Sequence, residues 1–111
     1  MVSSEKNTHN NQIHHIVCFK FKKNTTKIEI ENLRDSFLTL KNKIPGVIRI
    51  SGGENNSPEN LNKGFTHCFL IIFEDEQARK EYLPHPEHQI FISQLKPIME
   101  DVFVIDYEFK I

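Results

Sequence analysis

The stretch Phe65-Thr66-His67-Cys68-Phe69-Leu70-Ile71-Ile72-Phe73 has the clearest strand pattern in the chain and decides its fold. One face, taken at every second position, holds Phe65, His67, Phe69, Ile71 and Phe73. The opposite face holds Thr66, Cys68, Leu70 and Ile72, so it is largely apolar as well. Side chains of a strand alternate between the two faces of a sheet. A strand that is apolar on both faces therefore indicates a sheet that is covered on both sides.

The segments on either side of this strand show six further elements. Residues 13–21 alternate in the same way and predict a first strand. Over residues 25–43 the apolar side chains recur every three and four positions, which predicts an amphipathic helix. Thr26 and Glu29 are spaced as a capping box for that helix, and Pro45-Gly46 ends it. The remaining predicted elements are a short strand over 47–51, helices over 74–83 and from Pro86 onward, and a last strand over 102–109.

This order of elements is strand, helix, strand, strand, helix pair, strand. It predicts the α+β class with a ferredoxin-like, split βαβ arrangement, in which a four-stranded antiparallel sheet carries its helices on one face. The chain has 111 residues, which suits a single domain. We assign that domain to residues 13–109 and interpret the polar residues 1–12 as a flexible tail. In the polar loop over 54–64, Ser57-Pro58-Glu59 indicates one short helical turn.

The sheet face away from the helices carries too many apolar side chains for an exposed surface. On the last strand that face holds Phe103, Ile105, Tyr107 and Phe109. Soluble monomers rarely expose an apolar patch of this extent. A second copy packed face to face would cover it, so we predict a homodimer that forms a dimeric α/β barrel. A monomer with a twisted, half-protected face is the alternative. Asp106 and Tyr107 are interpreted as serving strand pairing and this interface.

Composition and charge exclude several classes of protein. The formal net charge is −1 with histidine neutral, and no basic stripe stands out, so nucleic-acid binding is not expected. No apolar run is long enough for a transmembrane helix, and residues 1–12 lack the apolar stretch of a signal peptide. We therefore expect no membrane partner and a cytoplasmic location. No phosphate-binding glycine loop, nucleophile elbow or redox pair is present, which gives no reason to expect a cofactor.

Short segments along the chain match a known family. They are HIVCFKF at residues 15–21, KIPG at 43–46, SPE at 57–59, KGFTH at 63–67, FE at 73–74, YLPHPEH at 82–88 and VIDY at 104–107. On these segments the chain resembles the stress-responsive A/B barrel domain (Dabb) family of the dimeric α/β barrel superfamily, over about residues 13–109. The resemblance implies the same fold, a homodimer and a part in stress responses. It implies no particular reaction, because a shared fold does not define an activity.

Three histidines and one tyrosine are candidates for a functional site. His67 falls on the face of its strand that we assign to the helices, together with His15 of the first strand. We expect these two histidines to approach each other under the helices. His88 lies in the first turn of a helix that begins at Pro86, where the positive end of the helix dipole favours a neutral imidazole. Tyr82 comes just before that turn and can reach the same cleft. Each histidine could instead be a purely structural, hydrogen-bonded group.

The resemblance also implies chemistry for these residues. Plant polyketide cyclases of this family close an aromatic ring by an aldol reaction, and their histidine base matches His88. Their tyrosine and strand histidine match Tyr82 and His67. In this sequence Ile90 and Ile92 stand in the helix where those cyclases have small glycines that line the pocket.

Two functions remain open from the sequence. In the first, the homodimer binds a small apolar or aromatic molecule, with a pocket lined by His15, Val17, Phe37, Phe69 and Phe91. In the second, it is a cofactor-free lyase or cyclase that uses His88, Tyr82 and His67. The two differ in the pocket, because a purely structural dimer would fill that space with Phe37, Phe69, Ile90 or Phe91. His85, His88 and His67 could form a three-histidine metal site, but no carboxylate or cysteine completes a metal motif, so none is predicted.

Overall fold

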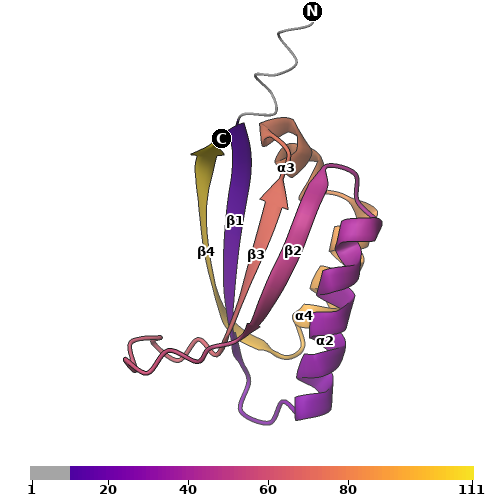
Figure 1. Ribbon diagram of the computed structural model, residues 1–111. Coiled ribbons are helices and arrows are strands. Elements are labelled where there is room, and N and C mark those ends of the chain that lie inside the picture. The colour runs from indigo at the N-terminus through magenta and orange to yellow at the C-terminus, as the bar shows by residue number, and fades with distance from the viewer. Residues whose placement is uncertain (1–10) are drawn as a thin grey trace, which may run out of the picture.

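The computed structural model describes residues 11–111. The elements, in chain order, are β1 (Asn11–Phe21), α2 (Lys27–Thr39), the 3-10 turn η1 (Leu40–Asn42), β2 (Val47–Glu54), β3 (His67–Phe73), α3 (Glu76–Tyr82), α4 (Pro86–Leu95) and β4 (Met99–Lys110). Figure 1 shows the four strands in one sheet, with the helices on one side of it. The predicted α+β class and ferredoxin-like arrangement are confirmed.

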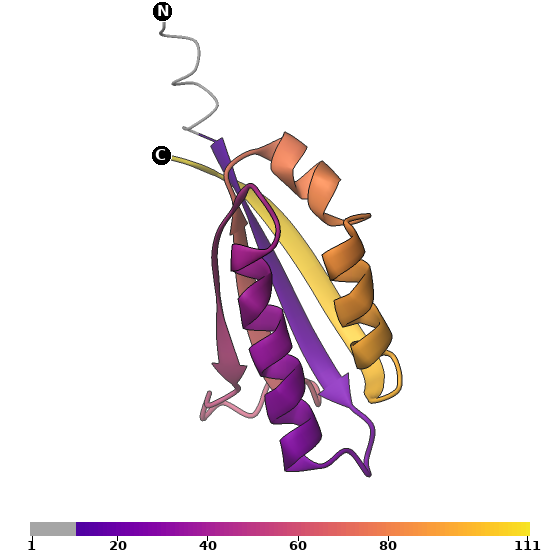
Figure 2. The ribbon, with the colours of Figure 1, turned by 90° about the vertical axis from the view of Figure 1, so that its right-hand side faces the viewer.

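The sheet is antiparallel, with the strand order β2-β3-β1-β4. The two central strands are β1 and β3, whose register places His15 opposite Ile71 and Phe19 opposite His67. Helices α2, α3 and α4 cover one face, as Figure 2 shows from the helix side. A layer of helices on one face of a sheet leaves the other face to solvent or to a partner.

The helices begin where local sequence signals place them. The Thr26 side chain accepts a hydrogen bond from the Glu29 amide at 3.1 Å, and the Glu29 carboxylate accepts from the Thr26 amide at 2.9 Å. This is the predicted capping box. Helix α4 starts with Pro86, and the ring of His85 caps it by accepting a hydrogen bond from the Glu87 amide at 3.0 Å. The start and direction of α4 place His88 within its first turn.

The core between the sheet and the helices is rich in phenylalanine. Phe37 of α2 lies at its centre, with ring centroids 4.4 Å from Phe91 of α4 and 4.8 Å from Phe69 of β3. Phe19 and Phe73 are almost fully buried on the central strands. This cluster packs α2 and α4 against the sheet. Buried aromatic rings contribute more apolar contact than smaller side chains.

Several element boundaries differ from the sequence interpretation, since β2 extends to Glu54, β3 begins at His67 and β4 begins at Met99. Strand β1 begins at Asn11, so Asn11 and Gln12 belong to the sheet rather than to the predicted tail, of which residues 1–10 lie outside the described part of the chain. The loop between β2 and β3 forms turns and no helical turn. Positive φ angles at Asn60 (59°) and Lys63 (55°) interrupt any helical run there.

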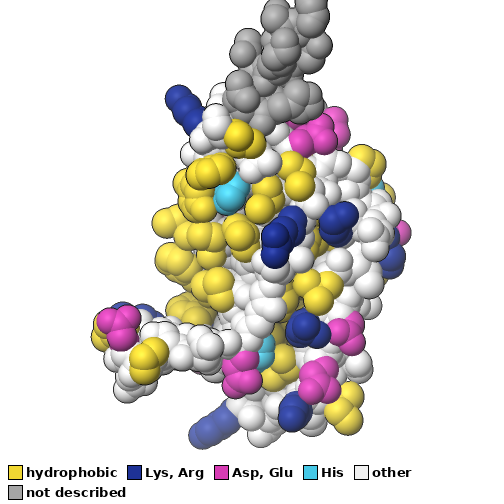
Figure 3. Space-filling model, in the orientation of Figure 1, with side chains coloured by type: hydrophobic (Ala, Val, Ile, Leu, Met, Phe, Trp, Pro, Cys, Tyr) yellow, Lys and Arg dark blue, Asp and Glu magenta, His cyan; other side chains and the backbone are white. Residues whose placement is uncertain are grey.

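The sheet face away from the helices is apolar and exposed. The side chains of Phe103, Ile105, Tyr107 and Phe109 on β4 are each about half exposed, at 47–51%. Figure 3 shows the apolar side chains gathered over β4 and β1 on this face. We call these four residues the outer row. Among the described residues, no helix is both long and apolar enough to cross a membrane.

Candidate functional site

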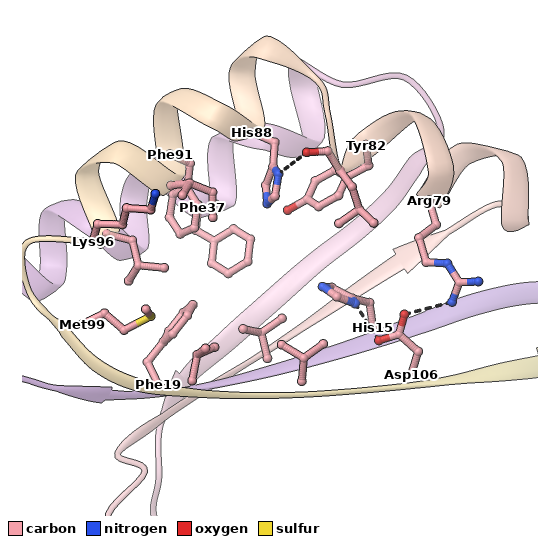
Figure 4. Close-up of a pocket in the computed structure, with 16 residues that line it drawn as sticks. His15, Phe19, Phe37, Arg79, Tyr82, His88, Phe91, Lys96, Met99 and Asp106 are labelled. Atoms are coloured by element: carbon pink, nitrogen blue, oxygen red, sulfur yellow. Dashed lines mark hydrogen bonds and ion pairs between the residues drawn. The ribbon is translucent and has the colours of Figure 1, made fainter.

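A cavity of about 650 Å³ lies between the sheet and helices α3 and α4. Its walls come from β1, α2, α3, α4 and β4, and most of its lining is apolar: Val17, Phe19, Phe37, Leu83, Phe91, Ile92, Leu95, Met99, Val102 and Val104. Its polar lining residues are His15, Arg79, Tyr82, His88, Lys96 and Asp106. A volume of this size suits a small organic ligand, and an apolar wall with few polar groups is typical of such sites. Figure 4 shows the polar groups His15, Tyr82 and His88 facing one end of the cavity.

The cavity opens along the edge of the sheet. Val102 and Val104 of β4 line it and yet remain 38% and 51% exposed. Strand β4 is an edge strand of the sheet that residues 11–111 form. A ligand therefore has a path from solvent to the buried polar end.

His88 is held in a defined orientation by the turn between α3 and α4. Its Nδ1 lies 2.9 Å from the backbone carbonyl of Leu83. A carbonyl can only accept, so Nδ1 carries the proton and Nε2 is free to accept one. Burial lowers the pKa of His88, and the nearby charges of His15 and His85 lower it further, although the bond to Leu83 acts in the opposite direction. His88 is thus a neutral base near neutral pH.

Tyr82 packs against His88 and presents its hydroxyl group to the same space. The ring centroids of the two residues lie 4.3 Å apart. The Tyr82 residue is 1% exposed, and burial raises the pKa of its hydroxyl far above its ordinary value. Figure 4 shows the hydroxyl pointing into the cavity. Because the phenol stays protonated, Tyr82 can donate a hydrogen bond and cannot act as a base.

His15 lines the cavity from the sheet side. Its Nδ1 lies 2.7 Å from Oδ1 of Asp106 on β4, and Oδ2 of Asp106 accepts a hydrogen bond from Nη1 of Arg79 on α3 at 3.0 Å. The ring centroids of His15 and Tyr82 lie 6.4 Å apart. The sheet and two helices thereby bring His15, Tyr82 and His88 to one end of the cavity.

The structure places four of the five residues of the predicted lining on the wall of the cavity and one behind it. His15, Val17, Phe37 and Phe91 all line the cavity. Phe69 is instead buried in the core behind it, packed between Phe19 and Phe37. The apolar side chains that could have filled the space leave it open. Of the two isoleucines on α4, Ile92 lines the cavity and Ile90 is 52% exposed on the outside of the helix.

His67 is not part of this constellation, contrary to the prediction that it approaches His15. It lies opposite Phe19 at the beginning of β3, four positions along the strand from Ile71, which is the partner of His15. It lines a separate hollow with Glu54 and Thr25, and its ring packs at 5.3 Å from that of Phe21. Alternation predicted the correct face, but only the register shows that the two histidines occupy opposite ends of it.

A three-histidine metal site does not form either. His85 turns its Nδ1 to the Glu87 amide, and His67 lies in another hollow. Within residues 11–111, no group of three or more His, Cys, Asp or Glu side chains is placed to hold a metal ion.

Asp106 is a cavity residue that the sequence interpretation missed. It was assigned to strand pairing and the interface, but its side chain faces the helices and binds His15 and Arg79. A signal was present, since Asp106 shares a strand face with Val102 and Val104 by alternation. A carboxylate on the face that packs under helices needs a partner, and that argument leads to a basic side chain.

The fold and this cavity define a class of protein: a ferredoxin-like α+β domain with a ligand-sized cavity under its helices. The chain belongs to the Stress responsive A/B Barrel Domain family, whose model matches residues 13–109. It is 33% identical to the stress-response A/B barrel domain-containing protein HS1 of Arabidopsis thaliana over 96 residues, which are 86% of this chain and 88% of that protein. It is 26% identical to olivetolic acid cyclase of Cannabis sativa over 95 residues, 86% of this chain and 94% of that enzyme.

Solved structures with the same fold support the classification. A dimeric protein of unknown function and ferredoxin-like fold from Bacteroides fragilis matches with a TM-score of 0.70 and 27% identity, over 88% of this chain and 96% of that one. The hydroxynitrile lyase of Passiflora edulis matches with a TM-score of 0.84, over 91% of this chain and 95% of that one. At 21% identity, the second likeness concerns the fold alone.

Proposed function

We propose that the protein is a homodimer that binds a small apolar or aromatic carbonyl compound in the cavity and catalyses a cofactor-independent proton transfer of the lyase or cyclase type. The observation that carries this proposal is the orientation of His88. Its Nδ1 is bound to the Leu83 carbonyl at 2.9 Å, so its free Nε2 belongs to a neutral base beside the Tyr82 hydroxyl. Such a base on the wall of an apolar cavity of about 650 Å³ is what carbon-acid chemistry requires.

The chemistry follows from the two groups. Nε2 of His88 removes a proton from a carbon next to a carbonyl group, and the electron pair of the C–H bond moves to the carbonyl oxygen as an enolate. The Tyr82 hydroxyl donates a hydrogen bond to that oxygen. In a cyclase the enolate carbon attacks a second carbonyl of the same molecule, whose oxygen then takes the proton back from His88. The relative olivetolic acid cyclase is named for a ring closure, which supports this class. His67, in its separate hollow, has no part in this proposal.

The outer row supports the homodimer. Phe103, Ile105, Tyr107 and Phe109 form a half-exposed apolar surface along β4. Ile16 of β1 lies opposite Ile105 in the sheet and extends this surface toward the centre. The neighbour from Bacteroides fragilis is described as dimeric. A second copy packed sheet to sheet removes this surface from water, which is favourable at roughly 25 cal/mol per Å² of apolar area.

A generic probe tests the base without knowledge of the natural substrate. In 5-nitrobenzisoxazole a base removes the ring C–H proton, the N–O bond breaks, and a coloured phenolate with a nitrile group forms. We expect the protein to open this probe faster than free imidazole at the same concentration. His88→Ala should lose about a hundredfold of that rate, whereas Gln94→Ala, an exposed change on the same helix, should keep it. A wild-type rate no greater than that of imidazole would contradict the catalytic part and leave a small-molecule binder.

A further inference from the structure

The second histidine of the cavity is His15. It belongs to a hydrogen-bonded chain of three side chains, His15, Asp106 and Arg79, that the proposed reaction does not use. Both oxygens of the Asp106 carboxylate are engaged, Oδ1 with His15 at 2.7 Å and Oδ2 with Arg79 at 3.0 Å. The three side chains are largely buried, with exposed fractions of 11% for His15, 22% for Asp106 and 29% for Arg79. Each comes from a different element, β1, β4 and α3, so the chain exists only in the folded protein.

This arrangement determines which nitrogen of His15 faces the cavity. A carboxylate only accepts, so Nδ1 of His15 donates to Asp106, and in the neutral imidazole Nε2 carries the lone pair. Figure 4 shows Nε2 turned toward the space under Tyr82. Arg79 supplies a positive charge to the other oxygen of the same carboxylate. The other charged partner of Arg79 is Glu76 at 3.9 Å, which is 83% exposed and hence screened by solvent.

The groups around His15 leave its Nε2 free for a ligand. On α3, Tyr82 approaches it with a ring centroid distance of 6.4 Å, and the apolar ring of Phe73 on β3 lies at 5.9 Å. On α4, His88 lines the same cavity, with its ring centroid 4.3 Å from that of Tyr82. His88 uses its own Nδ1 on Leu83. Within the described residues, the cavity head thus holds two histidine acceptors and one tyrosine donor.

We propose that Asp106 and Arg79 are positioning residues that hold His15 as a hydrogen-bond acceptor, so that the cavity selects apolar or aromatic ligands that also carry a hydroxyl group. The inference rests on the proposed small-molecule cavity and names the class of ligand it takes. His88 faces the acidic C–H, and His15, on the opposite wall, accepts the hydrogen bond of the hydroxyl group. An apolar molecule without that donor leaves Nε2 of His15 buried and unpartnered, which is unfavourable.

The tautomer of His15 provides a readout that needs no turnover. In nitrogen-15 NMR spectra of the labelled protein at neutral pH, with the signals assigned by His15→Gln, we expect the proton on Nδ1. In Asp106→Asn we expect the proton on Nε2 instead. Arg79 still donates to the oxygen of the new amide, so the NH₂ group faces His15 and donates to Nδ1. A wild-type spectrum with the proton on Nε2, or on both nitrogens, would overturn the inference.

Ligand preference provides the second readout. The probes are 2-naphthol and 2-methylnaphthalene, which differ by a hydroxyl group in place of a methyl group. We expect the wild type to bind the naphthol about tenfold more tightly, since one hydrogen bond contributes on this scale. Asp106→Asn should weaken the preference, because the Nε2–H group of the reversed tautomer can only donate to the phenol oxygen, which accepts less strongly than the phenol O–H donates. The affinity for 2-methylnaphthalene should stay unchanged. Arg79→Gln should reduce the preference for the naphthol. It serves as the second variant if Asp106→Asn does not fold.

The outcomes separate this inference from the proposed reaction. His88→Ala should keep the preference for the naphthol. A preference lost in His88→Ala and kept in Asp106→Asn would show that His88 is the acceptor and would overturn the inference, with the proposed reaction unaffected. Conversely, a protein that prefers the naphthol through His15 but opens no 5-nitrobenzisoxazole supports the inference and contradicts the reaction.

Discussion

The Nδ1 of His88 and the backbone carbonyl of Leu83 lie 2.9 Å apart, across the turn that joins α3 to α4. Gln89 donates to the same carbonyl at 2.9 Å, so the end of α3 and the start of α4 are joined by two side chains of α4. The carbonyl of Leu83 lies near the C-terminal end of α3 and would otherwise lack a helical partner. The hydrogen bond of His88 therefore helps to complete the turn and leaves Nε2 of the imidazole free to act as a base.

The pH dependence of the probe reaction should report on His88. Its pKa is lowered from the ordinary value of 6.5, mainly by burial. Only the neutral imidazole is a base, so the rate should be constant at neutral pH and fall as the pH drops through the lowered pKa. We expect the midpoint of this fall, measured with 5-nitrobenzisoxazole, below the ordinary value. A midpoint at or above 6.5 would show that the histidine is not desolvated as in the structure.

Tyr82→Phe should separate the role of the hydroxyl from that of the ring. The phenylalanine retains the ring that packs at 4.9 Å from Phe73 and 4.3 Å from His88, so we expect a change in the free energy of unfolding of no more than about 1 kcal/mol. The probe reaction should slow by about ten- to a hundredfold, because the developing phenolate loses its donor. Urea unfolding and initial rates measure the two effects. An unchanged rate would remove Tyr82 from the mechanism.

Ile105→Asp should dissociate the homodimer. Ile105 lies within the outer row and is 51% exposed, and a carboxylate there would be buried against the partner without a counter-charge. Light scattering after size-exclusion chromatography should give the mass of a monomer. The matched control is Ile28→Asp, an isoleucine that is 68% exposed on α2, which should leave the dimer intact. A wild-type protein that is already monomeric would contradict the proposed assembly.

Gly46→Ala should destabilise the fold. Gly46 has a φ of +88°, and a Cβ atom there would lie 2.6 Å from Cβ of Ala78 on α3. Both the backbone conformation and the close approach require glycine, so we expect a loss of about 1–3 kcal/mol in the free energy of unfolding. Gly53→Ala is the control, because no atom lies within 4 Å of its built Cβ. Equal stability of the two variants in urea would contradict this account.

The sequence by itself determined the features that depend on near neighbours. The capping box of Thr26 and Glu29, the start of α4 at Pro86 and the faces of the strands were predicted correctly, because each rests on contacts within a few residues. The same holds for the position of His88 in the first turn of α4. Alternation also predicted the outer row, since side chains along a strand change face at every residue.

Only the tertiary structure decided how distant residues meet. Asp106 binds His15 across 91 positions of the chain, and this contact depends on the pairing of β1 with β4. The same sheet keeps His67 away from His15, because the register of β1 and β3 sets positions along a face that alternation leaves undefined. The rotation of α4 turns Ile92 toward the cavity and Ile90 toward solvent. Register and helix rotation result from packing over the whole chain, and local sequence patterns do not contain them.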